Sequence, residues 1–241
     1  MSSILAWTKA ACLLLLASEA FASPIELEKR AYVLHLSMSA TREKSDMNTA
    51  LIETRGTGEP QGPSNSFKTM DAAIIAQLAG GTEYNTVYPA SIDQYSAKGT
   101  ADIINQITTG LKSNPNRCFI LEGYSQGAAA TVDAMSKITG ASFDAVKGVF
   151  LIGNPHHKSG LACNVDSNGG TTTKNVNGLT VLVASIPANW VSKTLDVCAY
   201  GDGVCDTAHG FGITAQHLSY KSDANVQNQG IKFVLGKLRG T

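Results

Sequence analysis

The segment Gly123-Tyr124-Ser125-Gln126-Gly127 constrains this chain more than any other part of its sequence. An apolar run at 118–121 precedes it, and an alanine-rich stretch with helical spacing at 126–138 follows it. A serine between two glycines, after a strand and before a helix, is typical of a nucleophile elbow, a turn so sharp that a side chain at either glycine would clash. Because the chain contains 23 glycines, the pentapeptide alone can arise by coincidence, and its flanks carry the prediction.

Residues 1–22 have the pattern of a secretory signal peptide. Lys9 precedes an apolar run at 10–17, and Ala20-Phe21-Ala22 has the small-x-small form of a cleavage site. The run is shorter than the roughly 20 residues that a membrane-spanning helix needs. We therefore expect secretion into the extracellular space and no integral membrane association.

Residues 23–30 end in the dibasic pair Lys29-Arg30, which predicts a propeptide removed by a Kex2-type protease. The alternative is an ordinary charged tail. The remainder, residues 31–241, has the length of one domain with a sizeable core. The 19 basic and 19 acidic side chains cancel, so electrostatics attracts neither nucleic acid nor an anionic membrane.

Removal of the signal peptide leaves the cysteines Cys118, Cys163, Cys198 and Cys205. Disulfides are expected in an oxidising compartment, and Cys198 with Cys205 is the clearest pair. Closing so short a loop is worth about 2–3 kcal/mol on the chain-entropy model. Metal binding is the alternative, but the spacing is not Cys-x-x-Cys. Whether Cys118 pairs with Cys163 stays open.

Strand and helix signals alternate along the chain, which predicts an α/β fold with a mostly parallel sheet. We expect strands at 51–54, 86–88, 118–121, 149–152 and 179–184, and helices over 70–78, 103–111, 126–138 and 231–238. Residues 32–34 also have a strand pattern. The segment 35–50 is polar and charged, and its composition offers no obvious core to join.

If Ser125 is a nucleophile, it needs a base, an acid that orients the base, and donors for an oxyanion. In hydrolases with an elbow, the acid and then the histidine follow the serine. Asp202 lies inside the expected disulfide loop, which suits a rigid carboxylate, although an Asp-Gly turn is the alternative. Judged from the residues alone, His217 and His209 are about equally good candidates for the base. The pair His156-His157 fits either a polar surface or a weak metal site.

Four motifs in this order resemble the cutinase family, most closely the fungal cutinase-like enzymes that also degrade synthetic polyesters. They are Arg55-Gly56-Thr57-Gly58-Glu59, the elbow pentapeptide, Cys198-x3-Asp202-x2-Cys205, and His217-Leu218-x-Tyr220. The resemblance extends from Leu51 to the C-terminus. It implies a three-layer α/β/α sandwich with a central, mostly parallel sheet, a minimal α/β hydrolase without a lid.

The resemblance also implies roles for individual residues. Ser125 would be the nucleophile, Asp202 the orienting acid and His217, rather than His209, the base. Thr57 and the backbone N–H of Gln126 would form the oxyanion hole. This chemistry requires no cofactor and no metal.

The implied function is that of a secreted serine esterase acting on cutin-like or other aliphatic polyesters and on short-to-medium acyl esters. The alternatives are an acetylxylan esterase and a non-catalytic surface-binding protein on the same scaffold. We expect a monomer whose partner is a polyester or lipid-like ester. The apolar loop 211–215 is either a surface for acyl chains or a buried turn.

Two departures from the family pattern lie near the N-terminus. The family usually ties an N-terminal cysteine to the position of Cys118, and the mature chain has no cysteine before it. Residues 32–34 and 51–53 look like halves of one family strand separated by 35–50. We hypothesise that 35–50 is an inserted loop or the product of a mis-joined gene model.

Overall fold

The computed structural model describes Glu26, Glu28, Arg30, Val33 and residues 48–240. The chain divides into two units, 1–44 and 45–241. The four described residues of the first unit are helical, so Val33 does not have the extended conformation predicted for 32–34. The predicted signal peptide, residues 1–22, lies outside the described residues.

The second unit is built on a six-stranded sheet in the order β2-β1-β3-β4-β6-β5. Every pair of neighbouring strands runs parallel, as predicted. The strands are β1 (Thr49–Thr54), β2 (Thr82–Asn85), β3 (Cys118–Tyr124), β4 (Val146–Ile152), β5 (Asn164–Val165) and β6 (Thr194–Val197). Parallel strands need long crossovers, and the helices supply them.

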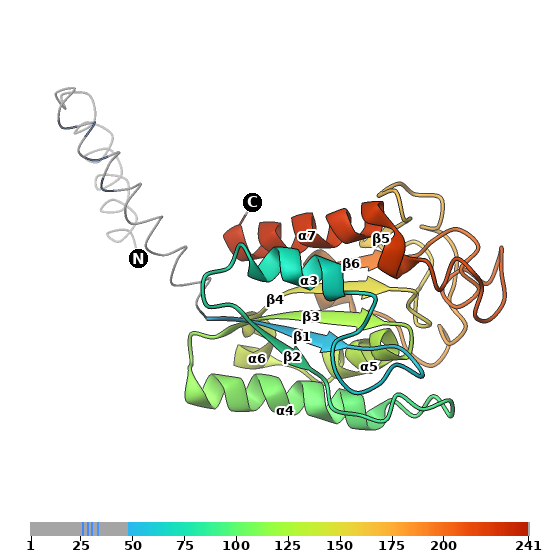
Figure 1. Ribbon diagram of the computed structural model, residues 1–241, viewed down its shortest axis with the longest axis horizontal. Coiled ribbons are helices and arrows are strands. Elements are labelled where there is room, and N and C mark those ends of the chain that lie inside the picture. Colours follow the sequence, from blue (N-terminus) through green and yellow to red (C-terminus); the bar gives the residue numbers. More distant parts are fainter. Residues whose placement is uncertain (1–25, 27, 29, 31–32, 34–47, 241) are drawn as a thin grey trace, which may run out of the picture. The chain divides into compact units, whose positions relative to one another are not determined.

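Helices cover both faces of the sheet, which gives the predicted three layers (Figure 1). One face carries α3 (Lys68–Ile75) and α7 (Ala224–Arg239). The other carries α4 (Ala97–Ser113), α5 (Gln126–Met135) and α6 (Gly140–Ala145). Short 3-10 turns follow at η1 (Ala188–Lys193) and η2 (Tyr220–Ser222). Helix α7 begins where the Asp223 side chain accepts the N–H groups of Asn225 and Val226.

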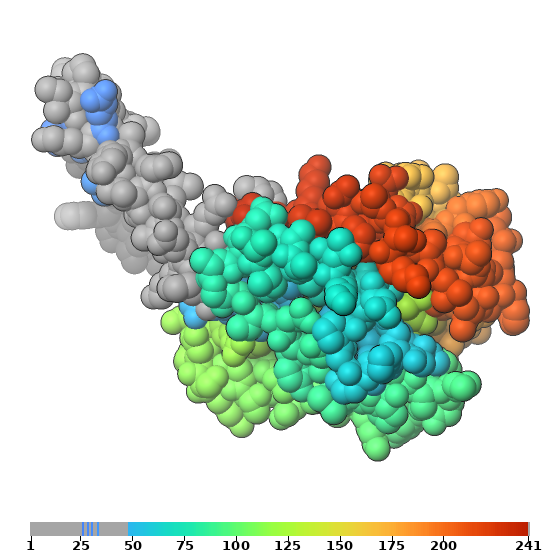
Figure 2. Space-filling model, viewed as in Figure 1, coloured from blue at the N-terminus to red at the C-terminus, as the bar shows by residue number. Residues whose placement is uncertain are grey.

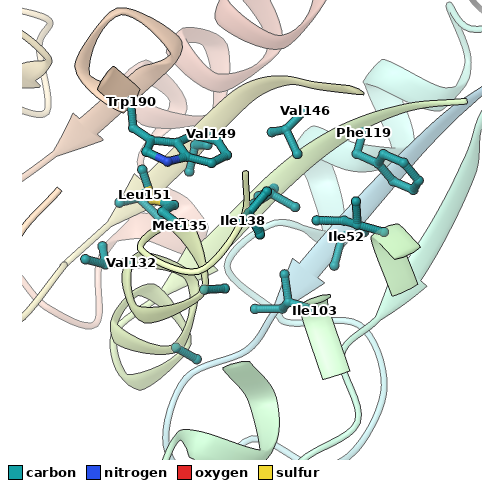
Figure 3. Packing of buried hydrophobic residues seen from close by; sticks show 14 of the residues in the cluster. Ile52, Ile103, Phe119, Val132, Met135, Ile138, Val146, Val149, Leu151 and Trp190 are labelled. Carbon is teal, nitrogen blue, oxygen red and sulfur yellow. The ribbon is translucent and has the colours of Figure 1, made fainter. Parts of the chain in front are cut away.

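Each face of the sheet has its own hydrophobic core, because successive side chains of a strand point to opposite faces. Toward α4 and α5, the fully buried Trp190 packs against β4 beside Val149 and Leu151 (Figure 3). Toward α3 and α7, the core contains Leu51 and Ile120. The teal residues of α3 and the red residues of α7 form adjoining parts of one surface (Figure 2).

Two predicted strands are wrong. Residues 179–184 form turns rather than a strand, with Leu182 99% exposed. Strand β6 pairs with β4 instead. It was not predicted, because its polar residues Thr194 and Asp196 interrupt the apolar pattern expected of a buried strand. The strand predicted at 86–88 begins and ends earlier, as β2.

The other predicted elements are present, although α4 begins at Ala97 and α7 at Ala224, well before the predicted starts at 103 and 231. The polar segment 35–50 needs one correction: its last residues, Thr49 and Ala50, are buried in β1 and pair with β3. None of the helices in the described part of the chain is long and apolar enough to cross a membrane.

Candidate active site

Ser125 lies in a sharp turn between β3 and α5. Its backbone φ is 56°, a value that residues other than glycine rarely adopt. Such a conformation costs about 1–3 kcal/mol and persists only where the surrounding structure holds it. A Cβ on Gly127 would lie 2.0 Å from the Thr54 carbonyl oxygen, and one on Gly123 would lie 2.7 Å from the Ala128 Cα. Both glycines are therefore required by close backbone approach, as the elbow pattern predicts.

The structure brings Ser125, His217 and Asp202 into one hydrogen-bonded chain. His217 Nε2 lies 2.9 Å from Ser125 Oγ, and His217 Nδ1 lies 2.9 Å from each carboxylate oxygen of Asp202. Asp202 is fully buried and Ser125 is 9% exposed. This is the geometry in which a histidine can take a proton from a hydroxyl while a carboxylate fixes its tautomer.

The Asp202 carboxylate is held by several donors. Val204 N donates to Oδ1 at 2.9 Å, and the Tyr220 hydroxyl donates to Oδ2 at 2.5 Å. The predicted disulfide between Cys198 and Cys205 closes the loop around it. Asp202 is therefore a buried acceptor and not an exposed turn residue. Burial and the nearby Asp202 charge raise the pKa of Tyr220 well above its ordinary value, so its hydroxyl remains a donor.

His217 is held by a residue to which the sequence assigned no role. The Tyr124 hydroxyl donates to the His217 carbonyl at 2.9 Å, and the two rings stack with centroids 5.2 Å apart. Behind the imidazole, a Cβ on Gly153 would lie 2.7 Å from His217 Cε1. Burial raises the pKa of Tyr124 well above its ordinary value, so this phenol also stays neutral.

Thr57, predicted in the oxyanion hole, lies on a loop that is braced at both ends. Gly56 N donates to a Glu59 carboxylate oxygen at 2.7 Å. The Arg55 guanidinium donates to the backbone carbonyls of Glu59, Thr86 and Tyr88. These bonds fix the loop that carries Thr57.

Thr57 Oγ1 lies 3.2 Å from Gln126 Oε1, and both residues border the same pocket as Ser125. The pocket has a volume of about 350 Å³. The remaining walls are mostly apolar, with Ala129, Leu179, Val183, Val204 and Ile213 among them. Such a cleft suits an acyl chain beside a polar reacting group.

One end of the pocket is polar. His156 Nδ1 lies 2.9 Å from Thr180 Oγ1, and His156 Nε2 lies 3.7 Å from an Asp133 carboxylate oxygen. His156 and His157 are both buried, so the pair is not a polar surface. His157 turns away from this pocket and contacts the Asp196 carboxylate at 2.8 Å.

Several other expectations are resolved by the geometry. His209, the rival base, contacts the Asp206 carboxylate at 2.9 Å and stacks on Tyr200, and the structure brings His217 to Ser125 instead. The loop 211–215 is not a buried turn, because Phe211 is 85% exposed. In the described part of the chain, the cysteines at 118 and 163 carry free thiols.

Comparisons with known proteins agree with the resemblance seen in the sequence. The sequence model of the family described as Cutinase matches residues 46–238. The cutinase of Hypocrea jecorina (strain Rut C-30) is 30% identical over 162 residues, which are 66% of this chain and 54% of that protein. The carboxylesterase Culp1 of Mycobacterium tuberculosis (strain H37Rv) is 29% identical over 194 residues, 78% of this chain and 81% of that protein. This chain spans about half the length of the Hypocrea jecorina relatives that it matches.

Solved structures share the fold. A cutinase-like protein from Cryptococcus sp. has a TM-score of 0.78 at 68% sequence identity, covering 79% of this chain and 95% of that one. The catalytic core domain of an acetyl xylan esterase from Trichoderma reesei has a TM-score of 0.65 at 23% identity, covering 79% of this chain and 98% of that one. The second likeness concerns the fold alone.

Proposed function

The chain belongs to the cutinase family, and on that premise we propose that it is a serine esterase that hydrolyses aliphatic polyesters and short-to-medium acyl esters. The observation that carries the proposal is the hydrogen-bonded chain from Ser125 through His217 to Asp202 at the wall of an apolar pocket. Acyl transfer needs these three groups in this order.

In the proposed mechanism, His217 takes the Ser125 hydroxyl proton as Ser125 Oγ attacks the ester carbonyl carbon. Asp202 stabilises the imidazolium that forms. The tetrahedral intermediate collapses when His217 donates that proton to the leaving alcohol, which leaves an acyl group on Ser125. A water, deprotonated by His217, then releases the acid and restores Ser125.

The oxyanion of each tetrahedral intermediate would be stabilised by Thr57 and the backbone N–H of Gln126. Removal of one such donor typically costs about 3–4 kcal/mol of transition-state stabilisation. The hydrogen bonds that Arg55 and Gly56 donate to Glu59 support this assignment, because a preformed donor does not have to reorganise during the reaction.

Apolar side chains around the pocket support an aliphatic polymer as substrate. Leu182 is 99% exposed, Phe211 85% and Ile92 87%, and their loops also supply Val183 and Ile213 to the pocket wall. Exposed apolar side chains gathered around one opening are typical of a surface that docks on apolar material. The balanced charge of the chain fits an uncharged substrate.

The proposal also includes secretion as a monomer, with cleavage after Ala22 and a second cleavage after Arg30. N-terminal sequencing and intact mass of the protein recovered from the culture medium test both cleavages. A secreted protein that begins at residue 23 would remove the propeptide from the proposal, and one that begins at Met1 would remove both.

Active-site labelling tests the nucleophile. A fluorophosphonate probe should label the wild-type protein stoichiometrically, and Ser125→Ala should abolish the label. Ser96→Ala is the matched control, because Ser96 borders the same pocket and its loss should leave labelling intact. An unlabelled wild type that is folded by circular dichroism would leave only a binding role.

Substrate preference tests the rest of the proposal. We expect kcat/KM on p-nitrophenyl esters to rise from acetyl to butyrate or hexanoate, and an aliphatic polyester emulsion to be cleared. Acetylated xylan is the comparison substrate, because solved structures of acetyl xylan esterases share the fold. Preference for acetylated xylan over the polyester would overturn the polyesterase assignment while leaving the esterase chemistry intact.

A further inference from the structure

The pocket beside Ser125 contains a hydrogen-bond donor and an acceptor that the proposed reaction does not use. They belong to His156, in the loop that follows β4, and to Asp133, near the end of α5. One face of α5 forms the wall between them and the elbow, because the pocket is bordered by Gln126, Ala129 and Asp133 at helical spacing. The pocket therefore runs along the helix, away from the reacting serine and toward this polar end.

The imidazole of His156 points its Nε2 toward Asp133. The residue is only 4% exposed, and its Nδ1 contacts Thr180, with the hydroxyl oxygen at 2.9 Å and the carbonyl oxygen at 3.1 Å. A carboxylate accepts hydrogen bonds only, so a proton on Nε2 is the arrangement that avoids two acceptors facing each other. The Thr180 hydroxyl then donates to Nδ1, and Nε2–H is a donor.

This donor and this acceptor do not satisfy each other. His156 Nε2 lies 3.7 Å from Asp133 Oδ1, which is longer than a hydrogen bond. Among the described residues, neither Nε2 nor the Asp133 carboxylate takes part in a hydrogen bond. His156 is therefore a buried polar side chain with an unused donor at the wall of a pocket, which points to a ligand.

A hydroxyl group is the chemical group that fits this gap. Its oxygen can accept from His156 Nε2–H while its hydrogen is donated to the Asp133 carboxylate. A carbonyl oxygen would use only the first of these bonds, and a methyl group would use neither. A carboxylate would be repelled by the charge of Asp133. The pair thus favours one terminal group and disfavours another, as specificity requires.

Both partners are held by the fold. His156 N donates to Asn154 Oδ1 at 2.9 Å. Thr180 N donates to the Pro155 carbonyl at 2.9 Å, which holds the loop that carries Thr180 against the one that carries His156. Asp133 projects from α5, the helix that begins at the elbow. A recognition site on such fixed elements keeps the geometry that discrimination between similar groups needs.

We propose that Asp133 and His156 determine specificity by binding a hydroxyl group on the acyl chain of the substrate, an inference that rests on the proposed esterase function. The acyl group stays on Ser125 while the alcohol leaves and water enters, so the wall along α5 suits the acyl chain. Asp133 is eight positions beyond Ser125, which is roughly 12 Å along the helix at about 1.5 Å per residue. An extended chain advances about 3.5 Å for every three bonds. The hydroxyl would therefore lie about ten bonds from the reacting carbonyl carbon.

The test compares three p-nitrophenyl esters of equal chain length: decanoate, ω-hydroxydecanoate, and the monoester of the ten-carbon diacid. In the wild type, kcat/KM on the hydroxylated ester should exceed that on decanoate by about tenfold or more, because hydrogen bonds to charged groups are the stronger ones. The acid-terminated ester should be the poorest substrate of the three.

Variants at Asp133 make the test specific. The side chain is 35% exposed, so its replacement carries little risk to folding. Asp133→Ala should lower the ratio of hydroxylated to plain ester to about one or below. Asp133→Asn retains an acceptor oxygen without the charge, so it should keep part of the hydroxyl preference and lose the discrimination against the acid. Asp144→Ala, at an exposed acid on α6 outside the pocket, is the matched control and should keep the wild-type ratios.

The outcomes separate this inference from the function on which it rests. Hydrolysis of decanoate and ω-hydroxydecanoate at equal kcat/KM by the wild type would overturn the role of the pair and leave the esterase function standing. An unchanged ratio in Asp133→Ala, whatever the absolute rates, would do the same. A wild type that hydrolyses none of the three esters would overturn both the esterase function and this inference.

Discussion

Tyr220 illustrates how much of the site rests on residues that do not touch the substrate. Its hydroxyl donates to Asp202 and accepts the N–H of Ala199, and the side chain is fully buried. Tyr124 holds the other end of the arrangement through the His217 carbonyl, 93 positions away in the chain. The proposed base is thus positioned directly by the phenol of Tyr124 and, through Asp202, by the phenol of Tyr220.

Tyr220→Phe should weaken this arrangement without abolishing it. Loss of a hydrogen bond to a charged group costs about 1.5–3 kcal/mol of stability, and we expect kcat on p-nitrophenyl butyrate to fall roughly tenfold with KM little changed. The pH profile of kcat/KM should also shift, because Asp202 loses a donor. Tyr200→Phe, at an exposed tyrosine, is the control. An unchanged kcat and pH profile in Tyr220→Phe would show that the phenol is only a packing element.

The pair His157 and Asp196 predicts a pH dependence of stability. Burial lowers the pKa of His157, but the Asp196 carboxylate and the Thr173 carbonyl outweigh it, so the pKa is raised. A raised pKa stabilises the folded protein below the ordinary value of about 6.5, and that stabilisation is lost as pH rises through the folded value. The wild type should therefore exceed Asp196→Asn in free energy of unfolding by an amount that shrinks as pH rises from about 6.5 through the raised pKa of His157.

Guanidinium unfolding at several pH values measures that difference, and Asp144→Asn serves as the control with a constant difference. A gap between wild type and Asp196→Asn that does not change with pH would contradict the assignment of charge to His157.

At the level of elements, prediction succeeded where burial follows an apolar pattern. Strands β3 and β4 are apolar runs enclosed on both faces, and both were predicted. Strand β6 was missed because Asp196 serves the buried His157 rather than the core. Residues 179–184 are as apolar as a strand, yet Leu179 and Val183 line the pocket.

Roles that depend on distant partners were harder to predict. The motifs supplied Ser125, Asp202 and His217 as candidates, and the cysteine spacing gave the disulfide. Tyr124 lies inside a recognised motif, but its contact with His217, 93 positions later, depends on how segments from different strands meet. No local sequence pattern encodes a contact between segments so far apart in the chain.

The loop closed by Cys198 and Cys205 supports Asp202, and its loss should be measurable. The double variant Cys198→Ser with Cys205→Ser should lose about 2–3 kcal/mol of unfolding free energy on the chain-entropy model. It should also lose activity at temperatures where it remains folded, because the loop that carries Asp202 is no longer closed by the disulfide. Cys118→Ser, at a free thiol, is the control and should change little. A double variant with wild-type kcat would show that the hydrogen bonds alone hold Asp202.

At the scale of the whole unit, the carboxyl ends of the parallel strands meet at one edge, where the elbow and the later loops gather (Figure 1). Open α/β sheets place their ligand sites at this edge. The exposed apolar side chains Leu182 and Phe211 belong to these loops. Under the proposed function, binding to a large apolar substrate would therefore depend on several loops together.

Leu182→Ser combined with Phe211→Ser tests that property. Hydrolysis of a solid polyester film should fall by about tenfold or more, because roughly 1.5–3 kcal/mol of apolar burial is lost for each side chain that docks fully, and about 1.4 kcal/mol is a factor of ten. Rates on soluble p-nitrophenyl butyrate should stay within about twofold of wild type. Val33→Ser, an exposed apolar residue of the other unit, is the control. Equal losses on film and soluble ester would indicate damage to the pocket instead.

The hydrogen-bonded chain of Ser125, His217 and Asp202 is held together by contacts within the protein itself. Under the proposed function, little time is then spent in arranging the catalyst, and turnover on a solid depends on how long each molecule stays adsorbed. If adsorption is too weak, the protein rarely binds the film. If adsorption is too strong, the protein stays bound where the polymer has already been hydrolysed. The fastest variants should therefore have intermediate residence times on the film. Additional apolar side chains on the loops around the pocket should eventually slow the reaction.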